Sequence, residues 1–163
     1  AFALGMLVLA LRRNPVLTGG DPLVKRSHGP EEINDLLAHS DYVLISAPNT
    51  ANTRGLIGED QLRHMKKTAV LINVGRGPVV VEAALIRALE EGWIKGAALD
   101  VFDVEPLPEG HPFYRLPNVL LSPHCADHTP GWIEESMQFF VDNFLRFHQG
   151  KSLHNLVDKR AGY

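Results

Sequence analysis

The sequence predicts an α/β fold built on a parallel sheet, and three observations lead to this prediction. Short apolar runs typical of buried strands alternate along the chain with segments whose apolar residues repeat at helical spacing. Glycine, proline and asparagine residues mark the boundaries between these segments. Strands and helices that alternate in this way usually form a parallel sheet with right-handed crossovers.

Five apolar runs are the expected strands of this sheet. They cover residues 7–11, 42–46, 69–73, 96–101 and 119–121. Most of these runs are short, as is usual for strands buried on both faces. Residues 1–4 are expected to be the tail of a preceding helix, and a loop is expected around Pro15, Gly19, Gly20 and Pro22.

Four helices are expected between and after these strands. The first begins near residues 27–32, where a proline and two acidic residues suit a first helical turn. A short helix follows at 59–65. The segment 82–91 has alanines and leucines on one face and ends at Gly92. The last helix covers 129–148, where aromatic and aliphatic residues follow helical spacing.

Composition limits the function classes that this chain fits. Its 163 residues are 45% hydrophobic and carry a net charge of −3, so neither nucleic acid nor a membrane is expected as a partner. The single cysteine, Cys125, cannot form an internal disulfide and fits a reducing compartment, so a cytoplasmic location is expected. The chain has no initiating methionine, so we expect it to begin inside a longer protein, and an organelle stays open as an alternative.

Three motifs directly follow expected strands, at residues 73–77, 100–106 and 122–124. The carboxyl ends of parallel strands meet at one edge of the sheet, where ligands bind in such folds. The motifs would therefore bring Arg76, Glu105 and His124 to the same edge. These side chains together are suited to the reduction of a keto acid.

Each of the three side chains also has a plainer interpretation. Arg76 can bind a carboxylate through two parallel hydrogen bonds, but Gly-Arg-Gly is also a common turn. Glu105 can orient an imidazole and favour its charged form, or it can be a loop acid beside the rigid Pro106. His124 can donate a proton near neutral pH, yet it is only one of eight histidines. Only the combination is specific.

The combination resembles the D-isomer-specific 2-hydroxyacid dehydrogenases, over most of the chain and in the family's order. The matching segments are residues 5–8, 71–77, 82–85, 96–102, 105–108, 117–119 and 122–124. The resemblance implies a Rossmann-like, doubly wound parallel sheet and hydride transfer between NAD(P)H and a 2-keto acid such as glyoxylate or hydroxypyruvate. It also implies that Arg76 binds the carboxylate and keto oxygen of the substrate, that His124 is the acid/base and that Glu105 orients it.

The resemblance further implies a cofactor site and a domain division. Asp100 would accept a hydrogen bond from the nicotinamide amide. The other residues expected at the cofactor are Ala47, Pro48, Val74, Gly75, Arg76, His124, Cys125, Ala126 and Asp127. Residues 1–128 would form a partial dinucleotide-binding domain, and 129–163 a helix and tail that return to a substrate domain. Family members are expected to be homodimers.

One departure from the family concerns the phosphate-binding turn. No Gly-x-Gly-x-x-Gly occurs in the sequence. We therefore expect the chain to be truncated at its amino end and to lack both the sheet's central strand and that turn. The strands at 7–11 and 69–73 would both pair with the missing strand and would both have an open edge. The isolated chain is therefore expected neither to bind dinucleotide nor to be active.

A second departure concerns cofactor choice. Arg12 and Arg13 stand where many family members have an acidic residue that binds the ribose hydroxyls. Arginine suits a 2′-phosphate, so the pair favours NADP(H) over NAD(H). A pair of solvated arginines is the alternative.

A metal site and a non-catalytic binding protein are the two alternatives to a dehydrogenase. The segment 124–128 contains imidazole, thiol and carboxylate groups, but no second pair of ligands has the spacing of a zinc site, so no metal is predicted. The alternative function is a non-catalytic, dinucleotide-binding corepressor on the same fold. Chemically competent residues at 76, 105 and 124 favour the enzyme.

Overall fold

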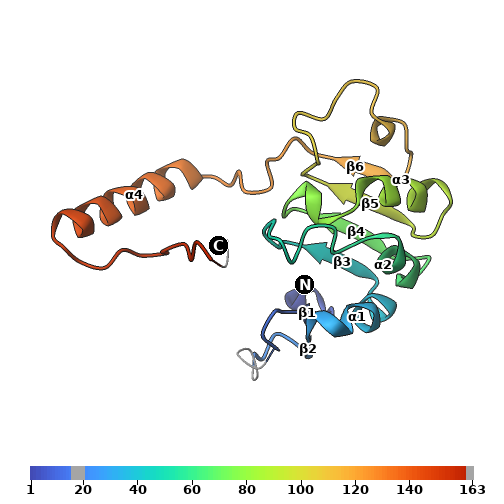
Figure 1. The fold of residues 1–163 in the computed structure, drawn as a ribbon, viewed down its shortest axis with the longest axis horizontal. Coiled ribbons are helices and arrows are strands. Elements are labelled where there is room, and N and C mark those ends of the chain that lie inside the picture. Colours follow the sequence, from blue (N-terminus) through green and yellow to red (C-terminus); the bar gives the residue numbers. More distant parts are fainter. Residues whose placement is uncertain (16–20, 161–163) are drawn as a thin grey trace.

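The computed structural model describes residues 1–15 and 21–160, so part of the loop expected near Gly19 and Gly20 lies outside the described residues. These residues form two parallel sheets (Figure 1). The first sheet contains β1 (Leu9–Leu11) and β2 (Arg26–His28). The second has the order β3 (Tyr42–Ile45), β4 (Val70–Asn73), β5 (Gly96–Leu99) and β6 (Val119–Leu121).

All five expected strands are present, and β2 is an addition that the sequence did not indicate. Its three residues, Arg-Ser-His, contain no apolar run, so the hydrophobic pattern has nothing to detect. The helix expected to begin at 27–32 therefore starts later. A short 3₁₀ segment at Pro30–Glu32 leads into α1 (Ile33–His39).

Three helices pack side by side on one face of the larger sheet: α1, α2 (Glu59–His64) and α3 (Glu82–Glu90) (Figure 1). Alternate strand residues, among them Ile45, Leu71 and Leu99, are buried in the core with helix residues. The residues between them include Leu44 and Leu120, whose side chains are 64% and 71% exposed. In the described chain this second face of the sheet is open to solvent. Short 3₁₀ segments complete the fold at Phe2–Leu4, Gly77–Val79 and Pro112–Tyr114.

The prediction that the strand at 69–73 has an open edge was wrong. β4 pairs with β3 on one side and with β5 on the other, each over four residue pairs. Within the described residues the two edge strands of the larger sheet are β3 and β6. The apolar pattern shows that a segment is a buried strand, but it does not state the order of strands across the sheet.

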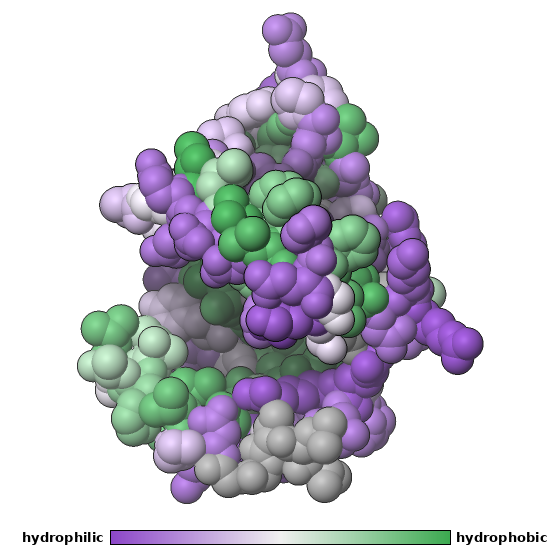
Figure 2. All heavy atoms as spheres, turned by 90° about the vertical axis from the view of Figure 1, so that its left-hand side faces the viewer, coloured by the Kyte–Doolittle hydropathy of each residue, from purple (hydrophilic) through white to green (hydrophobic). Residues whose placement is uncertain are grey.

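The last helix, α4 (Trp132–His148), extends away from both sheets (Figure 1). None of its residues, all of which the structure describes, is buried. Its exposed apolar side chains include Ile133, Met137, Phe140 and Phe144. Hydrophobic groups are visible on the face of the molecule that α4 presents in Figure 2. No helix in residues 1–15 and 21–160 has the length and apolar character needed to cross a bilayer. The division into 1–128 and 129–163 stays a prediction.

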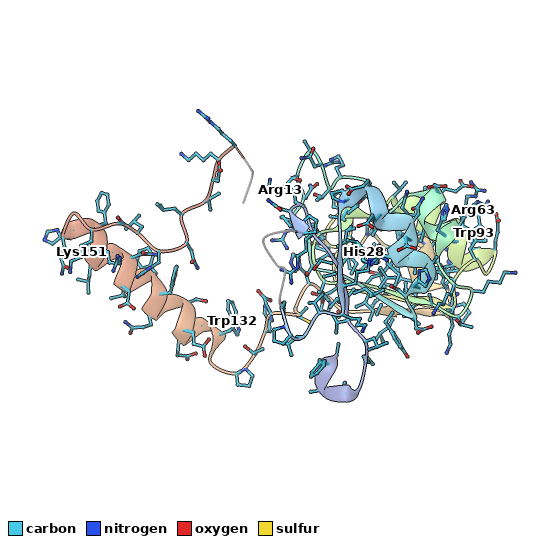
Figure 3. The ribbon with its side chains drawn as sticks, turned by 90° about the horizontal axis from the view of Figure 1, so that it is seen from below. Arg13, His28, Arg63, Trp93, Trp132 and Lys151 are labelled. Carbon is cyan, nitrogen blue, oxygen red and sulfur yellow. The ribbon has the colours of Figure 1, made fainter. Side chains whose placement is uncertain are left out.

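A surface cluster ties α2 to the segment after α3 (Figure 3). The guanidinium of Arg63 lies 3.6 Å from the centre of the Trp93 ring, and Trp93 Nε1 donates to Glu91 at 2.9 Å. Arg63 also donates twice to Glu59 in its own helix, at 2.9 and 3.0 Å. An exposed cation–π contact of this kind contributes about 0.5–1 kcal/mol. The cluster therefore helps to hold α2 against the segment that follows α3.

Candidate active site

The first loop of the site follows β4 and is shaped by Asn73, which is 1% exposed. Its side chain accepts a hydrogen bond from Gly75 N–H and donates to the carbonyl of Arg76, both at 3.1 Å. A buried amide with both of its groups bonded in this way fixes a tight turn. The turn places the exposed side chain of Arg76 at the carboxyl end of the sheet.

Two glycines allow neighbouring loops to approach this turn. A Cβ on Gly75 would lie 2.7 Å from the carbonyl oxygen of Ala47, in the loop after β3. A Cβ on Gly77 would overlap the backbone of Phe102 and Asp103, in the loop after β5. Larger residues at either position would push these loops apart. The loops after β3, β4 and β5 are thus in direct backbone contact.

The loops after β5 and β6 meet in a hydrogen bond of 2.7 Å between Glu105 Oε2 and His124 Nδ1. The other carboxylate oxygen of Glu105 accepts from the backbone N–H of Phe102 at 2.9 Å. This N–H bond, and then the His124 ring and the charge of Arg76, hold the pKa of Glu105 below its ordinary value, although burial opposes them. The three predicted catalytic side chains therefore converge, with Arg76 close enough to act on Glu105 electrostatically.

The loop that carries His124 is held by Asp100, whose carboxylate is buried at the end of β5. This carboxylate accepts hydrogen bonds from the Ser122 hydroxyl at 2.5 Å and from the N–H groups of Cys125 and Ala126, each at 2.9 Å. Burial alone would raise the pKa of Asp100, but these three donors hold its pKa below the ordinary value. Its predicted contact with a nicotinamide amide stays a prediction, since these bonds are all within the chain.

His124 has a left-handed backbone conformation, with φ at 53°. Residues other than glycine rarely adopt this conformation, and it costs free energy. The bonds from Asp100 to the two following N–H groups fix the backbone next to His124. In this conformation the imidazole is bonded to Glu105, and no feature of the sequence around Ser122 and Pro123 indicates the left-handed backbone.

The remaining residues expected at the cofactor lie along the same edge. Ala47, Val74 and Cys125 are partly accessible there, next to exposed Pro48 and Asp127. Among the described residues no group of three or more His, Cys, Asp or Glu side chains is placed to hold a metal ion.

Arg12 and Arg13 lie just beyond β1, in the smaller sheet. Arg12 N–H donates to the carbonyl of His28 at 3.0 Å, and its guanidinium lies 3.5 Å from the carboxylate of Asp21. Figure 3 shows Arg13 at the margin of the sheet region. The structure therefore separates the two arginines from Arg76, Glu105 and His124 by placing them on different sheets.

We expect Asp100→Asn to lower the free energy of unfolding by about 1–3 kcal/mol, because an amide oxygen cannot replace a carboxylate that accepts three hydrogen bonds. The effect should be fully present above the ordinary aspartate value near 3.8 and should decline below it, because the pKa of Asp100 in the folded protein is lowered. It should vanish only once the pH has fallen through that lowered pKa and the folded wild-type carboxylate is protonated. Urea denaturation of the full-length protein at several pH values measures both the loss in free energy of unfolding and its dependence on pH.

Asp103→Asn is the matched control. Burial, and then the charge of Glu82, raise the pKa of Asp103, so its charged form destabilises the fold at neutral pH. This substitution should leave the stability at pH 7 unchanged or higher. Equal losses in the two variants would contradict the role of Asp100.

Comparison with known proteins agrees with this geometry. A model of the family described as D-isomer specific 2-hydroxyacid dehydrogenase, NAD binding domain, matches residues 1–126. A glyoxylate reductase of Aeropyrum pernix is 47% identical over 129 residues, which are 79% of this chain and 38% of that protein. A glyoxylate/hydroxypyruvate reductase B of Serratia proteamaculans is 40% identical over 95% of this chain and 51% of that protein.

A solved structure shares the fold over nearly the whole chain. The D-isomer specific 2-hydroxyacid dehydrogenase of Xanthobacter autotrophicus Py2, in complex with NADPH and MES, superposes with a TM-score of 0.88 at 42% identity. The match covers 98% of this chain and 64% of that one, and it confirms the Rossmann-like fold. The chain spans about two fifths to two thirds of the length of these relatives. It belongs to the D-isomer-specific 2-hydroxyacid dehydrogenase family, and most of it corresponds to the NAD-binding domain.

Proposed function

We propose that this chain supplies the catalytic groups and the nicotinamide-binding edge of a reductase that converts a 2-keto acid to a D-2-hydroxy acid. The observation that carries this proposal is the 2.7 Å bond between Glu105 and His124, beside Arg76. The names of the relatives point to glyoxylate or hydroxypyruvate as substrate. The same names give no support to a non-catalytic corepressor.

Arg76 is suited to hold the substrate. One of its N–H groups donates to the carbonyl of Gly75 at 2.7 Å, which orients the side chain. A guanidinium has five such donors, so a planar pair remains for a carboxylate and a keto oxygen. The electrostatic effect of Arg76 on Glu105 indicates that a substrate bound there lies near the acid/base pair.

His124 is suited to transfer the proton. Its Nδ1 is bonded to Glu105, which places the proton of Nδ1 on that side and leaves Nε2 for the substrate. In its charged form Nε2–H donates a proton to the oxygen that gains negative charge during reduction. In the reverse direction the neutral Nε2 accepts the proton of the hydroxyl group.

The edge formed by the loops after β3, β4 and β6 fits a nicotinamide in part. Accessible Val74 and Ala47 offer an apolar surface beside the polar pair of Glu105 and His124. When bound, the nicotinamide supplies or accepts the hydride at carbon. The sequence contains no glycine-rich turn for the diphosphate, so these residues account for only one end of the cofactor.

His124→Gln should lower kcat for reduction of hydroxypyruvate by about 10²–10⁴-fold, because glutamine cannot donate a proton to the forming alkoxide. The measurement is the oxidation of NADPH and NADH by the protein as its gene encodes it. His128→Gln, at an exposed histidine four residues away, is the control and should keep its activity. A His124→Gln variant with wild-type kcat would refute the proposed role.

For the cofactor we propose a preference for NADPH, supported by Arg12 at the end of β1. Arg12→Ala should raise the KM for NADPH by about 10- to 100-fold, the value of a charge-assisted hydrogen bond to a phosphate. The KM for NADH should change less than twofold. An equal effect on both cofactors would show that Arg12 does not bind the 2′-phosphate.

The 163-residue chain by itself should neither bind dinucleotide nor be active. Its sequence lacks a glycine-rich diphosphate turn, and β3 has an open edge in the described structure. Isothermal titration with NADPH and a keto-acid assay on the isolated chain test this expectation. Measurable turnover would contradict it.

A further inference from the structure

A second pair of polar side chains lies behind the loop that carries Glu105. His111 Nε2 lies 3.1 Å from Glu82 Oε1, and the two residues are 29 positions apart in the chain. Their side chains are only 13% and 24% exposed. Neither residue touches the proposed substrate position, so the pair needs a separate explanation.

Both ring nitrogens of His111 are engaged. Nδ1 accepts a hydrogen bond from the backbone N–H of Phe113 at 3.3 Å and caps the 3₁₀ segment Pro112–Tyr114. A nitrogen that accepts carries no proton, so in the neutral ring the proton lies on Nε2 and is donated to the carboxylate of Glu82. The pair therefore joins the loop after β5 to the first turn of α3 in one defined orientation.

His111 is connected to Glu105 by packing and one hydrogen bond. The Phe113 ring centre lies 4.8 Å from that of His111 and 6.4 Å from that of Phe102. Phe102 and Phe113 are 8% and 3% exposed, so they are fixed in the core. The N–H of Phe102 then donates to Glu105 Oε1 at 2.9 Å. A continuous path of contacts therefore joins His111 to the carboxylate that is bonded to His124.

The surroundings of Glu82 show that its charge has a cost that His111 offsets. Glu82 is the first residue of α3, where the N-cap Val81 forms no side-chain cap with any described residue. Its negative charge raises the pKa of the neighbouring Asp103, after the larger effect of burial, and Arg54 only partly opposes this. The first turn of α3 favours a negative charge, and the hydrogen bond from His111 further offsets the repulsion between Glu82 and Asp103.

We infer that His111 and Glu82 are positioning residues for the reaction. Their hydrogen bond holds the loop from Phe102 to Phe113 against α3. The N–H of Phe102 in this loop then keeps Glu105 at hydrogen-bond distance from His124 Nδ1. This inference rests on the proposed function. It adds two residues that contact neither substrate nor cofactor.

The test uses His111→Asn and Glu82→Gln in the protein as its gene encodes it. Asparagine can still cap the 3₁₀ segment, but its shorter side chain does not reach Glu82. His111→Asn should lower kcat for hydroxypyruvate about 10- to 100-fold, as expected when a catalytic group is misplaced. The KM for NADPH should stay within twofold.

Glu82→Gln keeps a hydrogen-bond acceptor and should retain most of the wild-type rate. Glu109→Gln, at an exposed acid in the same loop, is the matched control and should match wild type in every measurement. If kcat of His111→Asn equals that of wild type, the inference is wrong. If His111→Asn does not fold, Glu82→Ala replaces it as the test variant. This substitution removes the hydrogen-bond acceptor while His111 still caps the 3₁₀ segment Pro112–Tyr114.

Proton NMR separates this inference from the proposed function. The N–H proton shared by His124 and Glu105 should give a downfield signal, assigned by its loss in His124→Gln. This signal should shift or broaden in His111→Asn even if wild type does not reduce keto acids, in which case the proposed function alone fails. An unchanged signal in His111→Asn would overturn the inference whatever the activity.

Discussion

The buried carboxylate of Asp100 is the interaction on which the rest of the site depends. It ends β5 and binds three donors from the loop after β6, so it couples the two strands that deliver Glu105 and His124. Burying a charge is costly unless it is fully hydrogen-bonded, and these bonds meet that condition. They also stabilise the left-handed backbone of His124, a conformation that an isolated loop would leave. The same three hydrogen bonds to Asp100 therefore stabilise the loop after β6 and fix the orientation of His124, the proposed acid/base group.

Backbone contact between loops has a similar role on the substrate side. Gly75 and Gly77 are the places where the loop after β4 touches the loops after β3 and β5. The buried amide of Asn73 accepts from the N–H of Gly75 and donates to the carbonyl of Arg76, which fixes the turn between the two glycines. Arg76 is thus mounted on a turn whose position is fixed by three strands. The exposed guanidinium is further oriented by its own hydrogen bond to the carbonyl of Gly75.

Much of this arrangement could be predicted from the sequence, and the failures have identifiable causes. β4, β5 and β6 are apolar runs, and their position at one edge follows from parallel pairing, so the convergence of the three motifs was predictable. β2 was missed because Arg-Ser-His has no apolar pattern. The open edge was assigned to 69–73 instead of β3 and β6 because strand order is a tertiary property. The bond between Glu82 and His111 joins distant positions, and neither residue stood out in its own segment.

The two sheets divide the proposed work between them. The larger sheet holds every predicted catalytic residue, whereas Arg12 belongs to the smaller one. In the described residues no strand pairing joins the sheets, and α1 links them by packing against both β1 and α2. The position of Arg12, the residue that we propose for the 2′-phosphate, is therefore set by β1 and β2, and the positions of Glu105 and His124, which we propose for proton transfer, are set by the loops after β5 and β6. Because separate elements hold the two groups, we expect a substitution near Arg12 to leave the bond between Glu105 and His124 intact.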